Sequence, residues 1–487
     1  MNNIDLKNKA VFGVLWTSIQ RFLSIFIQFV SGIILARLLT PDDYGCIGML
    51  TVFTLLASTI IDGGFSSALI QKKRPTDVDY STILIWNVGF SIVVYIILFI
   101  AAPYIAQFYK IELLCPVLRV QGIIVIIGAL QTVPVNILNK QMRFKKISIV
   151  TLVTSIISLI ITIVMAYSGF GVWSLVVQSI LSMAIPATVY WITSEWKPIL
   201  IFSTKSFKEL FSFGVYMFLT SLMTTLVKNV QSLLIGRFYN ASTLGYFSKA
   251  ASTERLASTA LSQVISQVTY PLYAEMQDDK TRLGCTIQRI TTAIAYVTFP
   301  LMILLILIAK PLFLILYTEK WLESVIYFQV LCLSGMALCL HSVNGQAIAA
   351  IGKSKVMFTW SVIKQSIGLI LLVFGLVFWG MTGLLIATVI SIWFVYFVNA
   401  SLVSRHIGYK LKTQLLDLLP IIVLSGFTFG ISFLLSLVMD CNMYILAIFQ
   451  MIVFAIIYIV LSILFKVKGL FLLMDMLTLI LSRFKRK

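Results

Sequence analysis

Charged residues are scarce in this sequence: they make up 11% of its 487 residues, against about 25% in ordinary globular proteins. A soluble protein of this length could not cover its surface with so few charges. Acidic residues are the scarcer kind, with 18 Asp and Glu beside 37 Lys and Arg, so the formal net charge is +19. The composition argues against a soluble enzyme, a nucleic-acid-binding protein and a disordered chain.

Groups that bind metals or perform catalysis are also few. The chain has two His and six Cys, and the cysteines show neither metal-type nor paired spacing, so we interpret them as inert apolar side chains. No nucleotide-binding loop or nucleophile–base constellation stands out. The longest exterior connections, near 103–116 and 310–324, are shorter than a glycan polymerase or ligase would normally present. We therefore expect no metal, no cofactor and no enzymatic activity.

Hydrophobic residues, in contrast, make up 60% of the chain, and they form runs of about 20 residues, the length that spans a bilayer as a helix. The alternating pattern of a membrane β-barrel is absent. We predict an all-α polytopic membrane protein with about fourteen transmembrane helices, of which the eighth is the weakest because it is rich in Ser and Thr. The predicted spans are 11–36, 45–70, 80–102, 117–138, 147–167, 171–193, 210–236, 247–272, 286–309, 325–350, 356–378, 382–403, 415–438 and 442–465.

The distribution of cations predicts the orientation. With the N-terminus inside, 25 Lys and Arg fall in cytoplasmic segments and 5 in the opposite loops, so both termini are expected in the cytoplasm. The first run has no clear cleavage pattern and is interpreted as a retained span. This topology explains most of the basic charge without a nucleic-acid partner. The seven remaining cations lie within predicted spans: Arg21, Arg119, Lys228, Lys249, Arg255, Arg289 and Lys364.

An internal repeat divides the chain. Residues 34–47 (ILARLLTPDDYGCI) match 234–247 (LIGRFYNASTLGYF) at an offset of 200, and a weaker match at an offset of 212 places 141–143 on 353–355 and Gly171 on Gly383. An even number of spans in each copy makes the repeats parallel. We predict a six-helix bundle at 1–205, a second at 206–412, an additional helix pair at 413–466 and a basic interfacial tail at 467–487.

Polar side chains follow one face of the first span and recur in the seventh. Steps of four, three, four and three residues place Thr17, Arg21, Ser24, Gln28 and Ser31 on one helix side, and the offset of 200 maps the last four onto Ser221, Thr224, Lys228 and Gln231. A charge at the bilayer centre costs at least about 2.5–3.5 kcal/mol on insertion scales, so such residues should face water or a partner. We predict a cationic, anion-attracting cavity with these substrate-binding residues: Arg21, Ser24, Gln28, Lys228, Gln231, Arg255 and Lys364.

A structural interpretation stands beside the functional one. Acidic residues within the spans could neutralise some of these cations, and Lys near a helix end can snorkel to the interface. We expect Lys249 and Arg289, near predicted span ends, to be interfacial. The intramembrane carboxylates Asp62 and Glu254 could bind a proton or Na⁺ and couple transport to an ion gradient. Asp62 precedes two glycines and could instead cap a broken helix.

Four segments carry a family resemblance: LARLLTPDDYG at 35–45, DGGFSSALIQKK at 62–73, LLIGRFYNASTLGYFSKA at 233–250 and YPLYAEMQDDKTRL at 270–283. With the duplicated six-helix core, the chain resembles the polysaccharide-transporter branch of the multidrug/oligosaccharidyl-lipid/polysaccharide flippase superfamily. The resemblance extends over essentially the whole chain, and the Wzx-type flippases and colanic-acid exporters are the most similar subgroup. It implies translocation of an undecaprenyl-pyrophosphate-linked oligosaccharide across a bacterial inner membrane.

Such a substrate suits the predicted cavity, because Arg and Lys can replace water around phosphates while Ser, Thr and Gln bond sugar hydroxyls. We expect lipid-linked oligosaccharide and membrane lipids as partners, glycan polymerase machinery as a further candidate, and function as a monomer. Three alternatives stay open. A lipid II flippase shares the plan, and a multidrug exporter would more naturally carry acidic cavity residues. A non-transporting scaffold for glycan synthesis is less consistent with repeated intramembrane charge.

Overall fold

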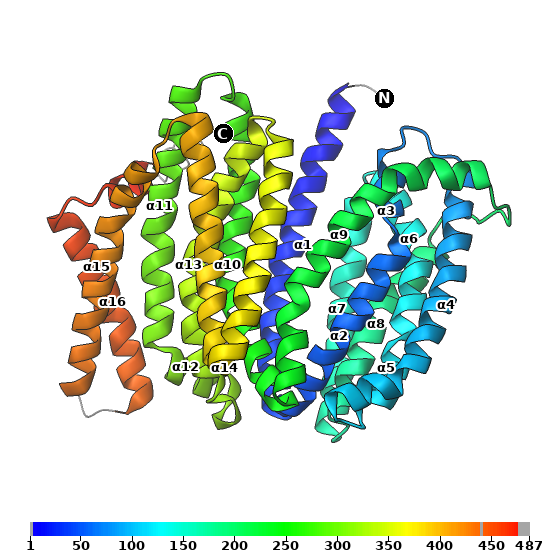
Figure 1. Ribbon diagram of the computed structural model, residues 1–487, viewed down its shortest axis with the longest axis horizontal. Helices are drawn as coiled ribbons and strands as arrows, with labels where there is room; N and C mark the ends of the chain where they lie inside the picture. The colour runs from blue at the N-terminus through cyan, green and yellow to red at the C-terminus, as the bar shows by residue number, and fades with distance from the viewer. Residues whose placement is uncertain (1–2, 439–441, 476–487) are drawn as a thin grey trace. The chain divides into compact units, whose positions relative to one another are not determined.

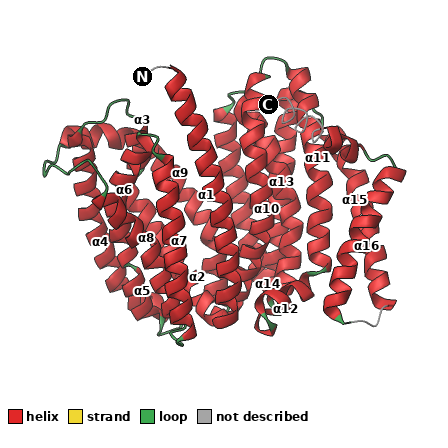
Figure 2. Cartoon of the chain, turned by 180° about the vertical axis from the view of Figure 1, so that it is seen from behind, coloured by secondary structure: helices red, strands yellow, loops and turns green. Residues whose placement is uncertain are grey.

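Helices make up the regular secondary structure of the computed structural model, which describes residues 3–438 and 442–475. Those residues contain no β-strand (Figure 2). The chain forms two compact units, 1–248 and 249–487, and α10 (Ala241–Glu275) runs from one into the other. The repeat boundary expected near residue 205 rests on sequence similarity, whereas the division into units follows contacts between residues. By contacts, the helix that begins at Thr204 belongs to the first unit.

The first unit is built from long helices that run roughly along one direction (Figure 1). Before α10 it contains α1 (Asn3–Leu38), α2 (Pro41–Asp62), α3 (Phe65–Gln71), α4 (Asp77–Tyr109), α5 (Leu114–Gln121), α6 (Ile123–Lys140), α7 (Phe144–Tyr167), α8 (Val172–Ile192) and α9 (Thr204–Phe238). The second unit continues with α11 (Lys280–Leu307), α12 (Ala309–Tyr317), the 3₁₀ turn η1 (Glu319–Trp321), α13 (Ser324–Ala350), α14 (Ser354–Ile407), α15 (Leu411–Val438) and α16 (Met443–Leu464).

Twelve helices in the described residues are long and apolar enough to cross a membrane. One of them, α14, holds two predicted spans joined at Gly380, whose φ of 62° and ψ of −143° are not helical. α10 falls outside the twelve, as its many Ser and Thr residues predict, yet it is a continuous 35-residue helix. The predicted polytopic helical fold is therefore confirmed, with the number of spans close to fourteen. The predicted tail is helical over 468–475, and 476–487 lie outside the described residues.

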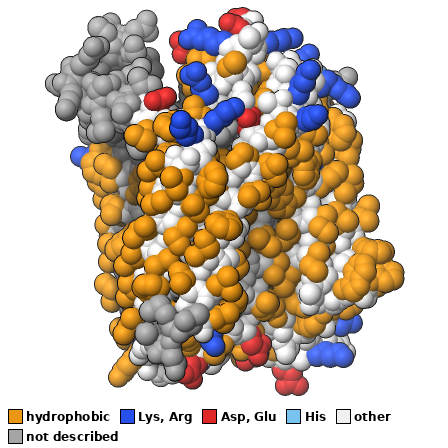
Figure 3. All heavy atoms as spheres, turned by 90° about the vertical axis from the view of Figure 1, so that its left-hand side faces the viewer, with side chains coloured by type: hydrophobic (Ala, Val, Ile, Leu, Met, Phe, Trp, Pro, Cys, Tyr) orange, Lys and Arg blue, Asp and Glu red, His pale blue; other side chains and the backbone are white. Residues whose placement is uncertain are grey.

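The outward surface of the helices suits lipid rather than water. Large apolar side chains are more than half exposed on α16, among them Ile445, Ile448 and Leu464. Figure 3 shows one face of the molecule with hydrophobic side chains over its middle and Lys and Arg gathered mostly at one end. Because lipid offers the backbone no hydrogen bonds, helices with such surfaces satisfy their own amides. The chain is a multi-pass membrane protein.

Local sequence signals set where the helices begin and end. Thr40 and Asp43 form a capping box at the start of α2, and Thr76 and Asp79 do the same for α4. α2 ends at Asp62 and is followed by the cap residue Gly63, whose left-handed φ of 52° favours glycine. The predicted span 45–70 is therefore two helices, α2 and α3, as the broken-helix alternative anticipated.

The repeat at the offset of 200 is visible in the backbone. α2 begins at Pro41 and α10 at Ala241, 200 residues later. The glycines of the two helices make reciprocal contacts: a Cβ atom on Gly45 would overlap the carbonyl oxygen of Ala241, and one on Gly245 would overlap that of Pro41. The two matched segments thus lie against each other through their repeat-related residues.

The weaker match at the offset of 212 has the wrong register. Gly171, with φ 50° and ψ −126°, resembles Gly380 in backbone conformation rather than Gly383, which is 212 residues on. Arg143 and Lys353 are likewise equivalent N-caps, with φ/ψ of −79°/48° and −82°/50°. The structural offset at these positions is therefore 209 to 210 residues, because backbone geometry distinguishes glycines that sequence matching treats alike.

Candidate functional site

The two strongest cationic candidates, Arg21 on α1 and Lys228 on α9, both have exposed side chains. Within the described part of the chain, neither makes a hydrogen bond or an ion pair. Ser24 is half-buried and accepts a 3.3 Å bond from Gln20. A charge within a membrane span that has no protein partner needs water or a ligand anion. Of their predicted companions, Gln28 is exposed and Gln231 is half-buried.

The cationic candidates of the second unit have local partners. Lys364 is half-buried, and its ammonium donates a 2.7 Å bond to Oδ1 of Asn399, which in turn donates to the carbonyl of His341. Arg255 is exposed, and its Nε donates to the carbonyl of Ala251 at 3.1 Å. The structural interpretation therefore has direct support at Lys364.

Glu254 is a buried carboxylate on α10, with 6% of its surface exposed. Its Oε1 has no hydrogen-bond partner among the described residues. A Cβ atom on Gly335 of α13 would overlap this oxygen, so the glycine makes room for the carboxylate. A buried polar atom without a partner is costly, which makes Glu254 a candidate for binding a proton or an ion.

Lys249 is a buried cation that the sequence did not place correctly. The side chain is 3% exposed, so the expectation that it lies at the membrane interface is wrong. Its ammonium lies 4.1 Å from the ring centroid of Tyr317 and 5.7 Å from that of Trp321. The Tyr317 hydroxyl lies 3.0 Å from that of Thr253. Cation–π contact offsets part of the desolvation of the ammonium, and its aromatic partners come from a distant segment that spacing on α10 could not reveal.

Asp62 occupies the break between α2 and α3. Its Oδ1 accepts bonds from the amide of Ser66, at 3.4 Å, and from the Ser66 hydroxyl. The capping alternative therefore has structural support. Asp62 also lines a cavity of about 340 Å³, together with Ser58 on α2 and Gln131 and Thr132 on α6.

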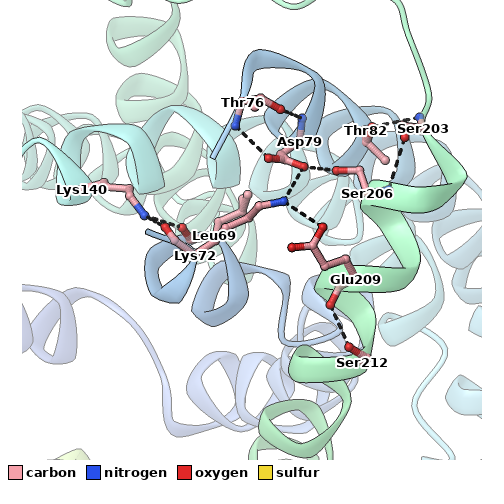
Figure 4. Close-up of polar contacts among 10 residues, drawn as sticks. All are labelled: Leu69, Lys72, Thr76, Asp79, Thr82, Lys140, Ser203, Ser206, Glu209 and Ser212. Atoms are coloured by element: carbon pink, nitrogen blue, oxygen red, sulfur yellow. Dashed lines mark hydrogen bonds and ion pairs between the residues drawn. The ribbon is translucent and has the colours of Figure 1, made fainter. Parts of the chain in front are cut away.

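A network of polar side chains links several helices of the first unit (Figure 4). The Lys72 ammonium lies 3.1 Å from carboxylate oxygens of both Asp79 and Glu209, and Asp79 also accepts from the Ser206 hydroxyl. Burial alone would lower the pKa of Lys72, but the two carboxylates raise it above its ordinary value. Lys140 donates to the carbonyls of Leu69 and Lys72, among others. The network joins α3, α4, α6 and α9.

Neither the network nor the buried groups form a metal centre. Across the ranges 3–438 and 442–475, no three His, Cys, Asp or Glu residues gather as metal ligands. The polar groups of the described helices are suited to hydrogen bonding, charge recognition and proton exchange.

Residues 34–326, more than half of the sequence, match the family model described as polysaccharide biosynthesis protein. The chain belongs to this family. All four motifs that carried the resemblance lie inside the matched residues, so the predicted membership is confirmed.

Curated relatives match most of the chain. The teichuronic acid biosynthesis protein TuaB of Bacillus subtilis is 27% identical over 73% of the chain and 74% of its own length. The lipopolysaccharide biosynthesis protein WzxC of Escherichia coli is 23% identical over 90% of the chain and 89% of its own length.

A solved structure shows the same fold. The lipid II flippase MurJ, in an inward closed conformation, aligns with a TM-score of 0.72 at 14% identity, over 94% of this chain and 99% of that one. At this identity the likeness establishes the architecture of this polysaccharide biosynthesis family member, not its substrate.

Proposed function

We propose that this protein is a flippase that moves an undecaprenyl-pyrophosphate-linked oligosaccharide, the repeat unit of an O-antigen, capsule or exopolysaccharide, across a bacterial cytoplasmic membrane. One observation carries the proposal: the polysaccharide biosynthesis match covers membrane-spanning helices with the architecture of a lipid II flippase. The helices supply a path through the bilayer. Alternating access, in which a substrate site opens to each side in turn, is the mechanism, and no chemical step is assigned to the chain.

The anionic pyrophosphate gives Arg21 and Lys228 a role in this proposal. Both side chains are exposed without a partner in the described residues, and both lie on helices of the first unit. A guanidinium and an ammonium replace water around phosphate oxygens with charge-assisted hydrogen bonds. Arg255 and Lys364 are the corresponding candidates of the second unit, and Ser24, Gln28 and Gln231 would bond polar parts of the glycan.

The excess of cations in the loops on one side supports an orientation with both termini in the cytoplasm. Substrate would then be loaded from the cytoplasmic leaflet. We further propose that the chain functions as a monomer, that glycan polymerase machinery consumes its product, and that Glu254 or Asp62 couples translocation to a proton or Na⁺ gradient. Glu254 is the better supported of these two coupling candidates, because its Oε1 is buried without a partner among the described residues. Asp62, in contrast, already accepts a bond from Ser66 at the start of α3.

The test is deletion of the gene, followed by extraction of lipid-linked saccharides and measurement of surface glycan. We expect the deletion strain to accumulate a lipid-linked oligosaccharide and to lose one surface polysaccharide, and the plasmid-borne gene to reverse both. Arrest of peptidoglycan synthesis with lipid II accumulation would identify a lipid II flippase instead. Altered drug accumulation with unchanged glycans would favour a multidrug exporter. Loss of glycan without accumulated precursor would favour a scaffold.

A further inference from the structure

A partly open cavity of about 340 Å³ lies in the first unit, beside the break between α2 and α3, and its lining combines polar with apolar side chains. Helix α6 forms another of its walls, where Gly128 and Ala129 line the space. The polar groups come from segments about 70 residues apart, which sequence spacing does not bring together. They are Ser58, Asp62, Ser66, Gln131, Thr132 and Asn136.

Hydrogen-bonding capacity in this cavity is incompletely used. Gln131 lines the cavity with a half-buried side chain whose amide makes no hydrogen bond to the described residues. The hydroxyl of Thr132 donates to the carbonyl of Gly128 at 2.9 Å, and that of Ser58 donates to the carbonyl of Thr54 at 2.9 Å, so both hydroxyl oxygens keep lone pairs for a ligand. The cavity therefore offers the Gln131 amide together with hydroxyl and carboxylate acceptors.

The cavity is larger than a single ion would fill. Its volume lies at the lower end of the range for small-molecule sites, about 300–1,000 Å³, and corresponds to about ten water molecules at roughly 30 Å³ each. The Asp62 carboxylate disfavours an anion. Adjacent sugar hydroxyls each donate and accept, which matches a wall that mixes amide, hydroxyl and carboxylate groups.

We propose that this cavity is a carbohydrate subsite that takes one uncharged sugar ring of the translocated glycan. The proposal rests on the proposed function and deepens it, because it separates recognition of the sugar from recognition of the pyrophosphate. In the proposed orientation the cavity lies toward the cytoplasmic ends of α2 and α6, where substrate is loaded. Asp62 then acts in selecting neutral sugars over uronic acids as well as in capping α3.

The experiment measures binding of free glycosides to the full-length protein in lipid nanodiscs by saturation-transfer NMR. The probes are the methyl glycosides of glucose, galactose, N-acetylglucosamine and glucuronic acid, which carry neither lipid nor phosphate. We expect saturable binding of at least one neutral glycoside and at least tenfold weaker binding of the glucuronide. Thr132→Val and Gln131→Leu should each weaken binding about fivefold or more.

Thr188→Val is the matched control. Thr188 belongs to the same unit, and its hydroxyl also bonds a carbonyl four residues earlier, at 2.9 Å, but it does not line the cavity. Each variant must retain the thermal midpoint of the parent within a few degrees. A folding-compromised Gln131→Leu would be replaced by Gln131→Glu, which keeps the shape and removes the amide donor.

Absence of saturable glycoside binding, equal binding of the glucuronide, or unchanged affinity in the cavity variants would each overturn the subsite. Saturable binding of Na⁺ without binding of any glycoside would identify an ion site instead. Translocation of the native lipid-linked substrate is measured separately in the same preparations. Translocation without glycoside binding would refute the sugar subsite but not the proposed flippase function. Glycoside binding without translocation or a glycan phenotype would refute the flippase function.

Discussion

Gly45 of α2 packs directly on the backbone of Ala241 at the start of α10, and no side chain separates them. The contact recurs with the roles exchanged at Gly245 and Pro41, and the Ser242 hydroxyl donates a 2.6 Å bond to Asp42 beside it. The residues in these pairs are related by the 200-residue repeat. Two helix starts are thus held by backbone contact within the repeated motifs.

We predict that Gly45→Ala and Gly245→Ala destabilise the protein, because each new methyl group would overlap a carbonyl oxygen. Overpacking of this kind costs about 1–3 kcal/mol. Gly89→Ala on α4 is the control, since a Cβ atom there meets nothing within 4 Å and alanine favours the helix. The measurement is the thermal midpoint in detergent. Equal midpoints for Gly45→Ala and Gly89→Ala would show that the two helix starts separate readily.

Removal of the charge of Arg21 or of Lys228 should impair translocation without affecting insertion into the membrane. We expect Arg21→Ala and Lys228→Ala to lower the rate roughly ten- to a hundredfold, the effect of losing a charged hydrogen bond of about 1.5–3 kcal/mol. Arg119→Ala is the matched control, because this guanidinium lies over the Phe99 ring at 4.3 Å and is already engaged. Glycan export in a deletion strain gives the readout, and full export by both alanine variants would refute the cationic site.

Glu254→Gln tests ion coupling. Glutamine has nearly the same shape but cannot exchange a proton or carry a negative charge, so we expect translocation in proteoliposomes to stop responding to an imposed ion gradient. Glu195→Gln is the control, because that carboxylate is 77% exposed and pairs at the surface with Arg143. If the response persists in Glu254→Gln, this carboxylate does not couple transport.

The Lys72–Asp79 pair should stabilise the first unit more than a surface pair does. Asp79 is 4% exposed and Lys72 is 23% exposed, whereas the pair Arg143–Glu195 is 43% and 77% exposed. A double-mutant cycle with Lys72→Met and Asp79→Asn should give a coupling energy above about 1 kcal/mol, against about 0–1 kcal/mol for the surface pair.

The pH dependence of this pair follows from the shifted pKa values of its two groups. The contribution of the pair is complete between the ordinary carboxyl pKa of 3.8 and the ordinary lysine pKa of 10.5. It is lost as pH rises through the higher pKa of Lys72 in the folded protein, or falls through the lowered pKa of Asp79. Coupling of equal size in the two pairs, or a loss of the Lys72–Asp79 coupling near neutral pH, would contradict this assignment.

The fold was predictable because its signals are local. Runs of apolar residues and the glycines after Asp62 are both signals that lie within a short stretch of sequence, and both are reproduced in the helices. The register of the second repeat was not predictable, because the sequence alone does not show that Gly380, rather than Gly383, has the non-helical backbone conformation. Stretches of apolar sequence also do not show where a helix breaks at a residue such as Gly122, between α5 and α6.

The site was predictable only in part, because its groups meet through tertiary contacts. The two polar stripes that contain Arg21 on α1 and Lys228 on α9 could be identified from helical spacing. The burial of Lys249 against Tyr317 could not, since the aromatic residue lies on another helix. The cavity beside the break between α2 and α3 likewise joins Asp62 to Asn136, which stand on different helices.

The ammonium of Lys140 has a consequence for how the chain is made. It donates 3.1 Å bonds to the carbonyls of Leu69 and Ile70 and a further bond to that of Lys72, so it caps the C-terminal end of α3. Lys140 follows Leu69 by 71 residues. During synthesis α3 therefore leaves the ribosome before this partner exists, and its last carbonyls gain the Lys140 ammonium only after α4, α5 and α6 have been translated. The capping contact at the end of α3 accordingly forms later than the helix itself is made.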